Sequence, residues 1–226
     1  MSATKVYRTG NSGTGIEYDN NWRVLDLGSG HNPHPRADVL VDKFLLDDPT
    51  VSGRSGRDVK IPAGKTFIVG DVNALPFKDK TFNFIVCSHV AEHIEDVDDF
   101  CREMIRVSEA GYIETPSKFA EVLRHPPYHI WYVSAKKHLL KFEAIPPGYP
   151  LKWFGKAFFS FYFYKSVQLD GKDVFQWAYG VPLPFDKVFL FTSRLIRRIW
   201  LRAKPITYTR FFWKDNFEWL IVKKDS

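Results

Sequence analysis

The stretch WRVLDLGSG, Trp22 to Gly30, decides the fold class of this chain. It opens with a short apolar run and ends in a Gly-x-Gly turn, a pattern typical of a buried strand that feeds a tight loop. Glycine has no Cβ and tolerates positive φ, so the backbone of this turn can approach a ligand closely. The stretch therefore predicts the first strand of an α/β sheet with a ligand site at its carboxyl end.

Four more short apolar runs continue the pattern, and each is predicted to be a strand: 38–42, 65–70, 81–87 and 111–115. Asp96 can cap a helix, because apolar residues recur at helical spacing from Val97 to Val107. Short buried strands separated by crossovers indicate a mostly parallel sheet, whose ligands bind outside the carboxyl ends of the strands. The fold class is therefore predicted as α/β and Rossmann-like.

Acidic residues end the second and third predicted strands. Asp42 can accept both hydroxyls of a ribose, Asp71 can accept the amino group of adenine, and the N–H of Val72 can meet a ring nitrogen. Together with the glycine turn these residues predict an adenosine site. A dinucleotide site is the rival, but it needs G-x-G-x-x-G, and the third glycine's place is taken by Pro33.

Several motifs in order resemble the class I S-adenosylmethionine-dependent methyltransferases, in particular the type 11 group that includes quinone-biosynthesis methyltransferases. They are VLDLGSG at 24–30, GDVNALPFKDKTFNFIVCSHVAEHIED at 70–96, FCREMIRV at 100–107 and GYIETP at 111–116. The resemblance covers about residues 22–117. It implies a Rossmann-like domain that binds S-adenosylmethionine.

The resemblance also implies roles for single residues. The implied contacts are Asp26, Gly28, Ser29 and Gly30 around the methionine part of the cofactor, Asp42 at the ribose, Asp71 and Val72 at the adenine, and Ser88 and His89 on the methyl-donor side. The chain departs from the family at two places. Asn32 replaces the family's third glycine, and the helix after the turn is compressed into about His31 to Arg36, as in a short-loop variant.

The letters His89-Val-Ala-Glu-His93 also match H-x-x-E-H, a zinc pattern of metallopeptidases. That pattern needs both histidines on one helical face, whereas His89 directly follows a strand and the helix begins only near Asp96. No metal site is therefore predicted. His93 is interpreted as a structural residue, and His89 or His93 as an alternative catalytic base, because imidazole titrates near neutrality.

Further candidate bases or substrate contacts follow the fifth strand, where this fold usually places the acceptor: Glu114, His125, Tyr128 and His129. The alternative interpretation is that residues 125–128 form only a kinked loop.

Four segments are predicted: an N-terminal arm at 1–21, read as loop; the S-adenosylmethionine-binding core at 22–117; an aromatic-rich substrate-side lid at 118–204; and a closing antiparallel β-hairpin at 205–226. Within the lid, 118–124 and 134–142 are predicted to be helical, Asp170-Gly171 a hairpin turn, and 186–203 a basic amphipathic helix.

Charge divides the chain into two parts. The net charge is +6, but residues from 151 onward hold 14 Lys and Arg against 6 Asp and Glu, and 21 of the 37 aromatic residues. This composition favours an anionic partner, and 186–203 could lie on an anionic membrane surface or pack its apolar face on the sheet. No RNA-binding motif is visible, so nucleic acid is not the expected partner.

Two cysteines without a C-x-x-C pair favour a reducing compartment, and the sequence shows neither a signal core nor an apolar run that could span a bilayer. We expect a cytoplasmic protein, with peripheral membrane contact through 186–203 as an option. The predicted activity is methyl transfer from S-adenosylmethionine to an oxygen of a small molecule, glycan or lipid-linked intermediate. The alternative is an inactive methyltransferase-like binding or scaffold protein, but the intact Asp42 and Asp71 favour a working cofactor site.

Overall fold

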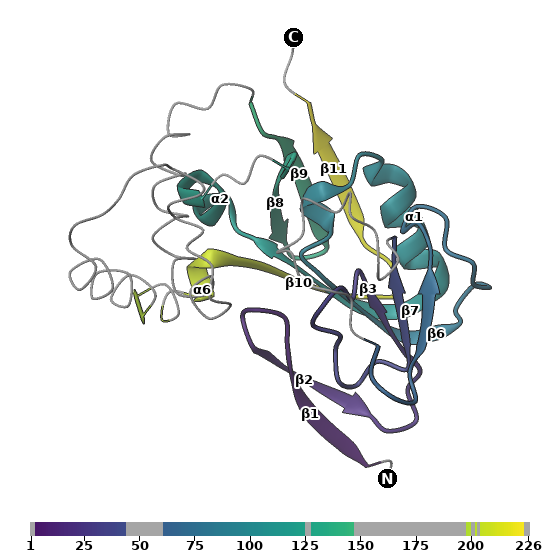
Figure 1. The fold of residues 1–226 in the computed structure, drawn as a ribbon. Helices are drawn as coiled ribbons and strands as arrows, with labels where there is room; N and C mark the ends of the chain where they lie inside the picture. Colours follow the sequence, from purple (N-terminus) through teal and green to yellow (C-terminus); the bar gives the residue numbers. More distant parts are fainter. Residues whose placement is uncertain are drawn as a thin grey trace, which may run out of the picture.

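The structure, a computed structural model, describes residues 3–43, 61–124, 128–146, 198–199, 202 and 204–223. Its centre is a six-stranded sheet in the order β10-β7-β6-β3-β4-β5 (Figure 1). The strands are β3 (Val24–Leu27), β4 (Val39–Asp42), β5 (Thr66–Val69), β6 (Phe82–Ser88), β7 (Ser108–Pro116) and β10 (Tyr208–Lys214). All neighbours are parallel except β10 and β7. The mostly parallel α/β sheet is as predicted.

The strand order reverses between β3 and β6. The chain runs outward from β3 through β4 to β5, and then returns to the other side of β3 to lay down β6 and β7. In an open parallel sheet this reversal opens a crevice at the carboxyl ends of the two strands, where ligands bind. Every residue of β3 and β4 is buried, which explains why these strands read as continuous apolar runs.

Helix α1 (Val97–Val107) begins where the sequence predicts. Asp96 caps it, because its side chain accepts a hydrogen bond from the N–H of Asp99 at 3.0 Å. The predicted apolar stripe is the buried face of this helix. The described part also contains the short helices η1 (Ala91–His93), α2 (Lys118–Arg124) and α6 (Lys204–Thr207). Helix α2 confirms the helix predicted at 118–124.

A second, three-stranded sheet has the order β11-β9-β8 and lies above the central sheet in Figure 1. Its strands are β8 (Trp131–Lys136), β9 (Leu139–Ala144) and β11 (Glu218–Val222). The helix predicted at 134–142 is therefore wrong. Leu140 and Phe142 are buried two residues apart, which is strand periodicity, and Lys137 takes φ 53° in the two-residue loop between β8 and β9.

The closing hairpin predicted at 205–226 is also wrong. β10 pairs with β7 and β11 pairs with β9, so the two strands belong to different sheets. Trp213 of β10 lies opposite Gly111 of β7, and its indole ring occupies the space that a side chain at Gly111 would fill. A Cβ added at Gly111 would lie 2.6 Å from the Nε1 atom of Trp213. Phe217 then turns into the same core, and the chain moves to the second sheet instead of folding back.

The N-terminal segment, predicted as a loop, contains a β-hairpin of β1 (Thr4–Thr9) and β2 (Thr14–Asp19). Gly10 and Gly13 adopt positive φ in its turn. Tyr18 is fully buried and makes an edge contact with Phe84 of β6, which fixes the hairpin against the central sheet.

Several predictions fall outside the described residues: His125, the turn at Asp170-Gly171, and nearly all of the basic helix at 186–203. Strands β3 to β7 lie within the predicted core of 22–117, whereas α2, β8 and β9 begin the segment predicted as a lid. In the part of the chain that the structure describes, no helix is long and apolar enough to cross a membrane.

Candidate functional site

The glycine turn after β3 is held by the end of β4. The N–H groups of Gly28 and Ser29 donate to the carbonyl of Val41 at 2.8 and 3.2 Å, and the N–H of Gly30 donates to Asp42 Oδ2 at 2.9 Å. Gly28 has φ 74°, and a Cβ there would lie 2.2 Å from a methyl carbon of Val90. Only glycine fits this position, so the first motif and the acid of the second strand meet as predicted.

Asp26 lies beneath this turn and is 5% exposed. Burial raises its pKa, the hydrogen bond from the N–H of His34 at 2.7 Å lowers it, and the charge of Asp42 raises it again, to about 7. Burial also lowers the pKa of His34 to about 4. The hydroxyl of Ser29 is buried and has no hydrogen-bond partner among the described residues. The turn therefore presents a carboxyl group and a hydroxyl group suited to a polar ligand.

Asp71 lies beyond the carboxyl end of β5. The N–H of Gly70 donates to the carbonyl of Asp42 at 3.0 Å, which brings the ends of β4 and β5 together. The carboxylate of Asp71 accepts from the N–H of Asn73 at 2.9 Å and pairs with Lys43 Nζ at 3.4 Å. Its side chain is 44% exposed, so it remains accessible to a ligand, and Val72 beside it is buried.

Ser88 ends β6, and His89 leaves the strand with φ 61°, an uncommon conformation for a residue other than glycine. The His89 ring lies between two buried carboxylates: Nδ1 is 3.1 Å from Glu92 Oε1, and Nε2 is 3.6 Å from Glu114 Oε1, an ion-pair distance too long for a hydrogen bond. Burial alone would lower the pKa of His89, but Glu114 and Glu92 outweigh it and raise the pKa to about 9. His89 is therefore an imidazolium at neutral pH.

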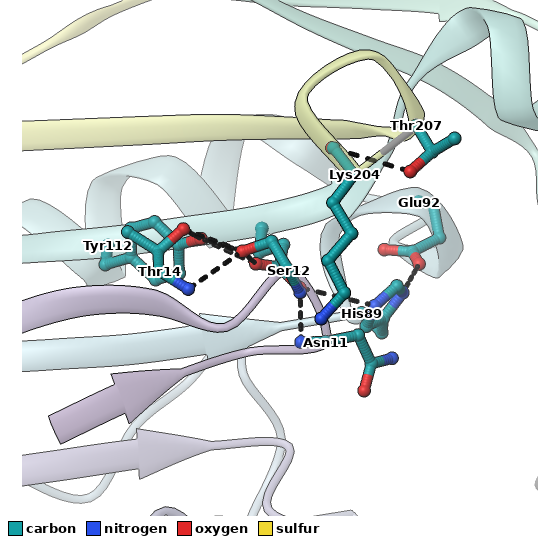
Figure 2. Close-up of polar contacts among 9 residues, drawn as sticks. Asn11, Ser12, Thr14, His89, Glu92, Tyr112, Lys204 and Thr207 are labelled. Carbon is teal, nitrogen blue, oxygen red and sulfur yellow. Dashed lines mark hydrogen bonds and ion pairs between the residues drawn. The ribbon is translucent and has the colours of Figure 1, made fainter. Parts of the chain in front are cut away.

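Glu114 is covered by the turn of the N-terminal hairpin. Asn11 and Ser12 of this turn lie near His89 and Tyr112 in Figure 2. It accepts hydrogen bonds from the N–H groups of Asn11 and Ser12, from the Ser12 hydroxyl and from the Tyr112 hydroxyl. A Cβ at Gly10 would lie 2.3 Å from the Glu114 carboxylate, so the turn approaches it as closely as the backbone allows. The hairpin thus closes over the carboxyl end of β7.

These turn residues were missed by the sequence prediction. The letters GNSG at 10–13 are a turn signal, and between two short strands they could have predicted a hairpin. Nothing in the sequence could have placed that turn on Glu114, because the two lie more than a hundred residues apart.

A second polar cluster lies behind His89 and joins η1 to the segment before β8. One ligand atom from each of Glu92, His93 and His129 lies within 4.8 Å of the others. His129 Nδ1 lies 2.7 Å from Glu121 Oε1 of α2, and His93 Nδ1 lies 3.2 Å from the Tyr128 carbonyl. The structure thus brings together two of the candidate histidines, His93 and His129, and leaves His89 on the other side of Glu92.

The central part of the chain is similar to known methyltransferases. Residues 49–113 match the family model of a methyltransferase domain. Norajmaline N-methyltransferase from Rauvolfia serpentina is 46% identical over 46 residues, covering 20% of this chain and 16% of that protein. Demethylmenaquinone methyltransferase from Renibacterium salmoninarum is 32% identical over 91 residues, covering 39% of this chain and 38% of that protein. The chain thus spans less than half the length of the curated relatives it matches.

Solved structures also align with the chain. The YcgJ protein from Bacillus subtilis is 24% identical and aligns with a TM-score of 0.36, covering 48% of this chain and 54% of that one. The PH0226 protein from Pyrococcus horikoshii is 21% identical with a TM-score of 0.35, covering 51% and 57%.

The sheet order and the strand-end site are those of a Rossmann-like ligand-binding domain. Within that class, the family match and the curated relatives confirm the predicted resemblance to class I S-adenosylmethionine-dependent methyltransferases. The methyl donor of this class is S-adenosylmethionine.

Proposed function

We propose that the protein transfers a methyl group from S-adenosylmethionine to an oxygen of a small molecule, glycan or lipid-linked intermediate. The observation that carries the proposal is the hydrogen bond from the N–H of Gly30 to Asp42, with Asp71 beside it at the next strand end. Gly30, Asp42 and Asp71 belong to the glycine turn and the two strand ends from which the adenosine site was predicted. The match of residues 49–113 to a methyltransferase domain supports it.

The residues at the strand ends fit the cofactor. Asp26 would face its ammonium group, a cation that would favour the charged form of this buried carboxyl group. The unpartnered hydroxyl of Ser29 would donate a hydrogen bond to it. Asp42 would hold the ribose hydroxyls, and Asp71 with the N–H of Val72 would hold the adenine. When bound, S-adenosylmethionine supplies a methyl group already activated by a sulfonium.

His89 is proposed to position other groups, instead of acting as the predicted base. Glu114 and Glu92 raise the pKa of His89 to about 9, which favours the protonated ring over a role as base. The protonated ring would pair with both carboxylates and hold them in place at the end of β6. Of the histidines predicted as candidate bases, His93 and His129 are the two others that the structure describes, and they could assist the acceptor.

The choice of oxygen rests on these two imidazoles and the Glu92 carboxylate. A hydroxyl acceptor must lose its proton during methyl transfer, and Glu92, His93 and His129 are polar groups close to one another that can promote this loss. The names of the curated relatives include nitrogen methylation of an alkaloid and methylation of a menaquinone precursor. Those acceptors are the acceptors of the two relatives. A test on this chain must therefore compare nitrogen acceptors with oxygen acceptors.

An acceptor panel tests the proposal. The purified chain is incubated with methyl-labelled S-adenosylmethionine and matched acceptors that differ only in a hydroxyl or an amine, and labelled product is measured. We expect label on hydroxyl acceptors. Label on amines alone would contradict the oxygen assignment, and cofactor binding without transfer to any acceptor would favour the inactive binding protein.

A further inference from the structure

The cluster of Glu92, His93 and His129 has the composition of a metal site. Two imidazoles and one carboxylate are the protein ligands of one type of catalytic zinc site. Zinc in such a site has three protein ligands and keeps its fourth coordination position open for water or substrate. Tetrahedral zinc holds such ligands about 3.3 Å apart. Here the ligand atoms lie within 4.8 Å of one another, so small side-chain rotations would bring them to that spacing.

The second nitrogen of each ring is already engaged in the manner of a metal ligand. His129 Nδ1 contacts the buried carboxylate of Glu121 at 2.7 Å, and His93 Nδ1 contacts the carbonyl of Tyr128 at 3.2 Å. A carbonyl or carboxylate oxygen can only accept, so each contact leaves the proton on Nδ1 and the lone pair of Nε2 available to a metal ion. A carboxylate or carbonyl behind the imidazole is the outer shell that normally fixes a metal-bound histidine. Among the described residues, neither Nε2 atom has a hydrogen-bond partner of its own.

The Glu92 carboxylate gives independent support for a bound cation. The residue is 1% exposed, and its Oε1 atom bonds to His89 at 3.1 Å. Its Oε2 atom is buried and has no hydrogen-bond partner within the described part of the chain. A buried carboxylate oxygen without a partner carries a large desolvation cost, which a cation at this point would remove.

We propose that Glu92, His93 and His129 bind a divalent first-row transition metal ion, with zinc as the best match to the ligands, and that Glu121 orients His129 from behind. The site is not the one spelled by H-x-x-E-H, because His89 lies across Glu92 from it and the second imidazole comes from the segment before β8.

The position of the site suggests its use, and this step rests on the proposed methyl transfer. Glu92 belongs to the metal site and also contacts His89, the residue that follows the end of β6 and that the resemblance places on the methyl-donor side. A metal ion with an open position lowers the pKa of a bound hydroxyl. An acceptor hydroxyl bound there would release its proton to solvent, and its oxygen would be ready to receive the methyl group.

Calorimetry on the full chain tests the site itself, without cofactor. The protein is stripped with a chelator and titrated with zinc chloride, and Co²⁺ is used in parallel because its absorption reports coordination. We expect one zinc per chain and a tetrahedral Co²⁺ spectrum. We expect His93→Gln and His129→Gln to weaken zinc binding at least tenfold, and Glu121→Gln to weaken it about tenfold through the outer shell.

His138→Gln is the matched control, because this histidine lies exposed in the loop between β8 and β9. It should leave zinc affinity unchanged. No stoichiometric zinc binding by the stripped protein, or equal affinity in the folded His93→Gln and His129→Gln variants, would overturn the proposal. Circular dichroism of each variant identifies those that fold. Failure here leaves S-adenosylmethionine binding untouched, so it is distinct from failure of the proposed function.

Discussion

The backbone N–H of His34 donates a 2.7 Å hydrogen bond to Asp26, and this contact joins two buried groups whose pKa values move in opposite senses. Asp26 rises from 3.8 to about 7, and His34 falls from 6.5 to about 4. Both groups are therefore held uncharged by burial under the glycine turn. Their effects on stability oppose each other over most of the mildly acidic range.

The first prediction separates the two groups. Between pH 3.8 and 7 the folded protein holds the Asp26 proton more tightly than the unfolded chain, so this group makes stability fall as pH rises. Between pH 4 and 6.5 the unfolded chain protonates His34 more readily, so this group makes stability rise with pH. The effect across its window is roughly 4 kcal/mol for Asp26 and roughly 3 kcal/mol for His34.

Urea denaturation at a series of pH values checks this. His34→Gln leaves the Asp26 effect unopposed by His34, so from pH 4 to pH 7 the slope of the free energy of unfolding should be more negative than in the unsubstituted protein. Asp26→Asn leaves the His34 effect unopposed by Asp26, so from pH 4 to pH 6.5 the slope should be more positive than in the unsubstituted protein. Slope changes of the same sign in both variants would show that the two groups are not the ones that titrate.

A second prediction concerns Gly28. Gly28→Ala adds a Cβ that would lie 2.2 Å from Val90, in a backbone conformation that L-residues avoid. Gly64→Ala is the control, because Gly64 has a similar φ of 78° and no atom within 4 Å of the added Cβ. The control should cost about 1 kcal/mol of stability from strain alone. Gly28→Ala should cost roughly 2 kcal/mol more, and Val90→Ala in the same chain should restore part of the difference.

Thermal unfolding gives these differences directly. Equal loss of stability in Gly28→Ala and Gly64→Ala would mean that Val90 does not pack against the turn as described. A lack of any rescue by Val90→Ala would have the same meaning.

The third prediction tests the correction to the fold at β8 and β9. Lys137 has φ 53° in the loop between these strands, so Lys137→Gly should relieve strain and raise stability by roughly 0.5–1 kcal/mol. Lys136→Gly, one residue earlier and within β8, should lower stability. If the segment were helical, as its sequence suggested, both glycines would destabilise it alike. Chemical denaturation of the two variants distinguishes these outcomes.

The parallel core could be predicted from the sequence because its signals are local. Buried strands such as 24–27, the cap at Asp96 and the acids at the strand ends each depend on a few neighbouring letters. The errors came where distant packing decides. β10 and β11 are adjacent in sequence and separated by a short turn, yet Trp213 opposite Gly111 commits β10 to the central sheet.

The candidate site divides in the same way. Gly30, Asp42 and Asp71 could be placed from their strand ends, because parallel strands finish at one edge. The pairing of His93 with His129 could not, since it depends on α2 and the segment before β8 folding onto η1. The pKa of His89 likewise depends on Glu114, which the fold delivers from the neighbouring strand.

Calorimetric titration of the full chain with S-adenosylhomocysteine, the demethylated cofactor, tests the central claim most directly. We expect one site per chain, and an affinity reduced about tenfold to a hundredfold in Asp71→Asn, because a hydrogen bond to a charged acceptor is lost. Asp79→Asn, at an exposed carboxylate whose ion pair in the described part of the chain is with Arg106, should bind as the unsubstituted protein does. Absence of binding to the unsubstituted chain, or unchanged affinity in Asp71→Asn, would contradict the proposed cofactor site.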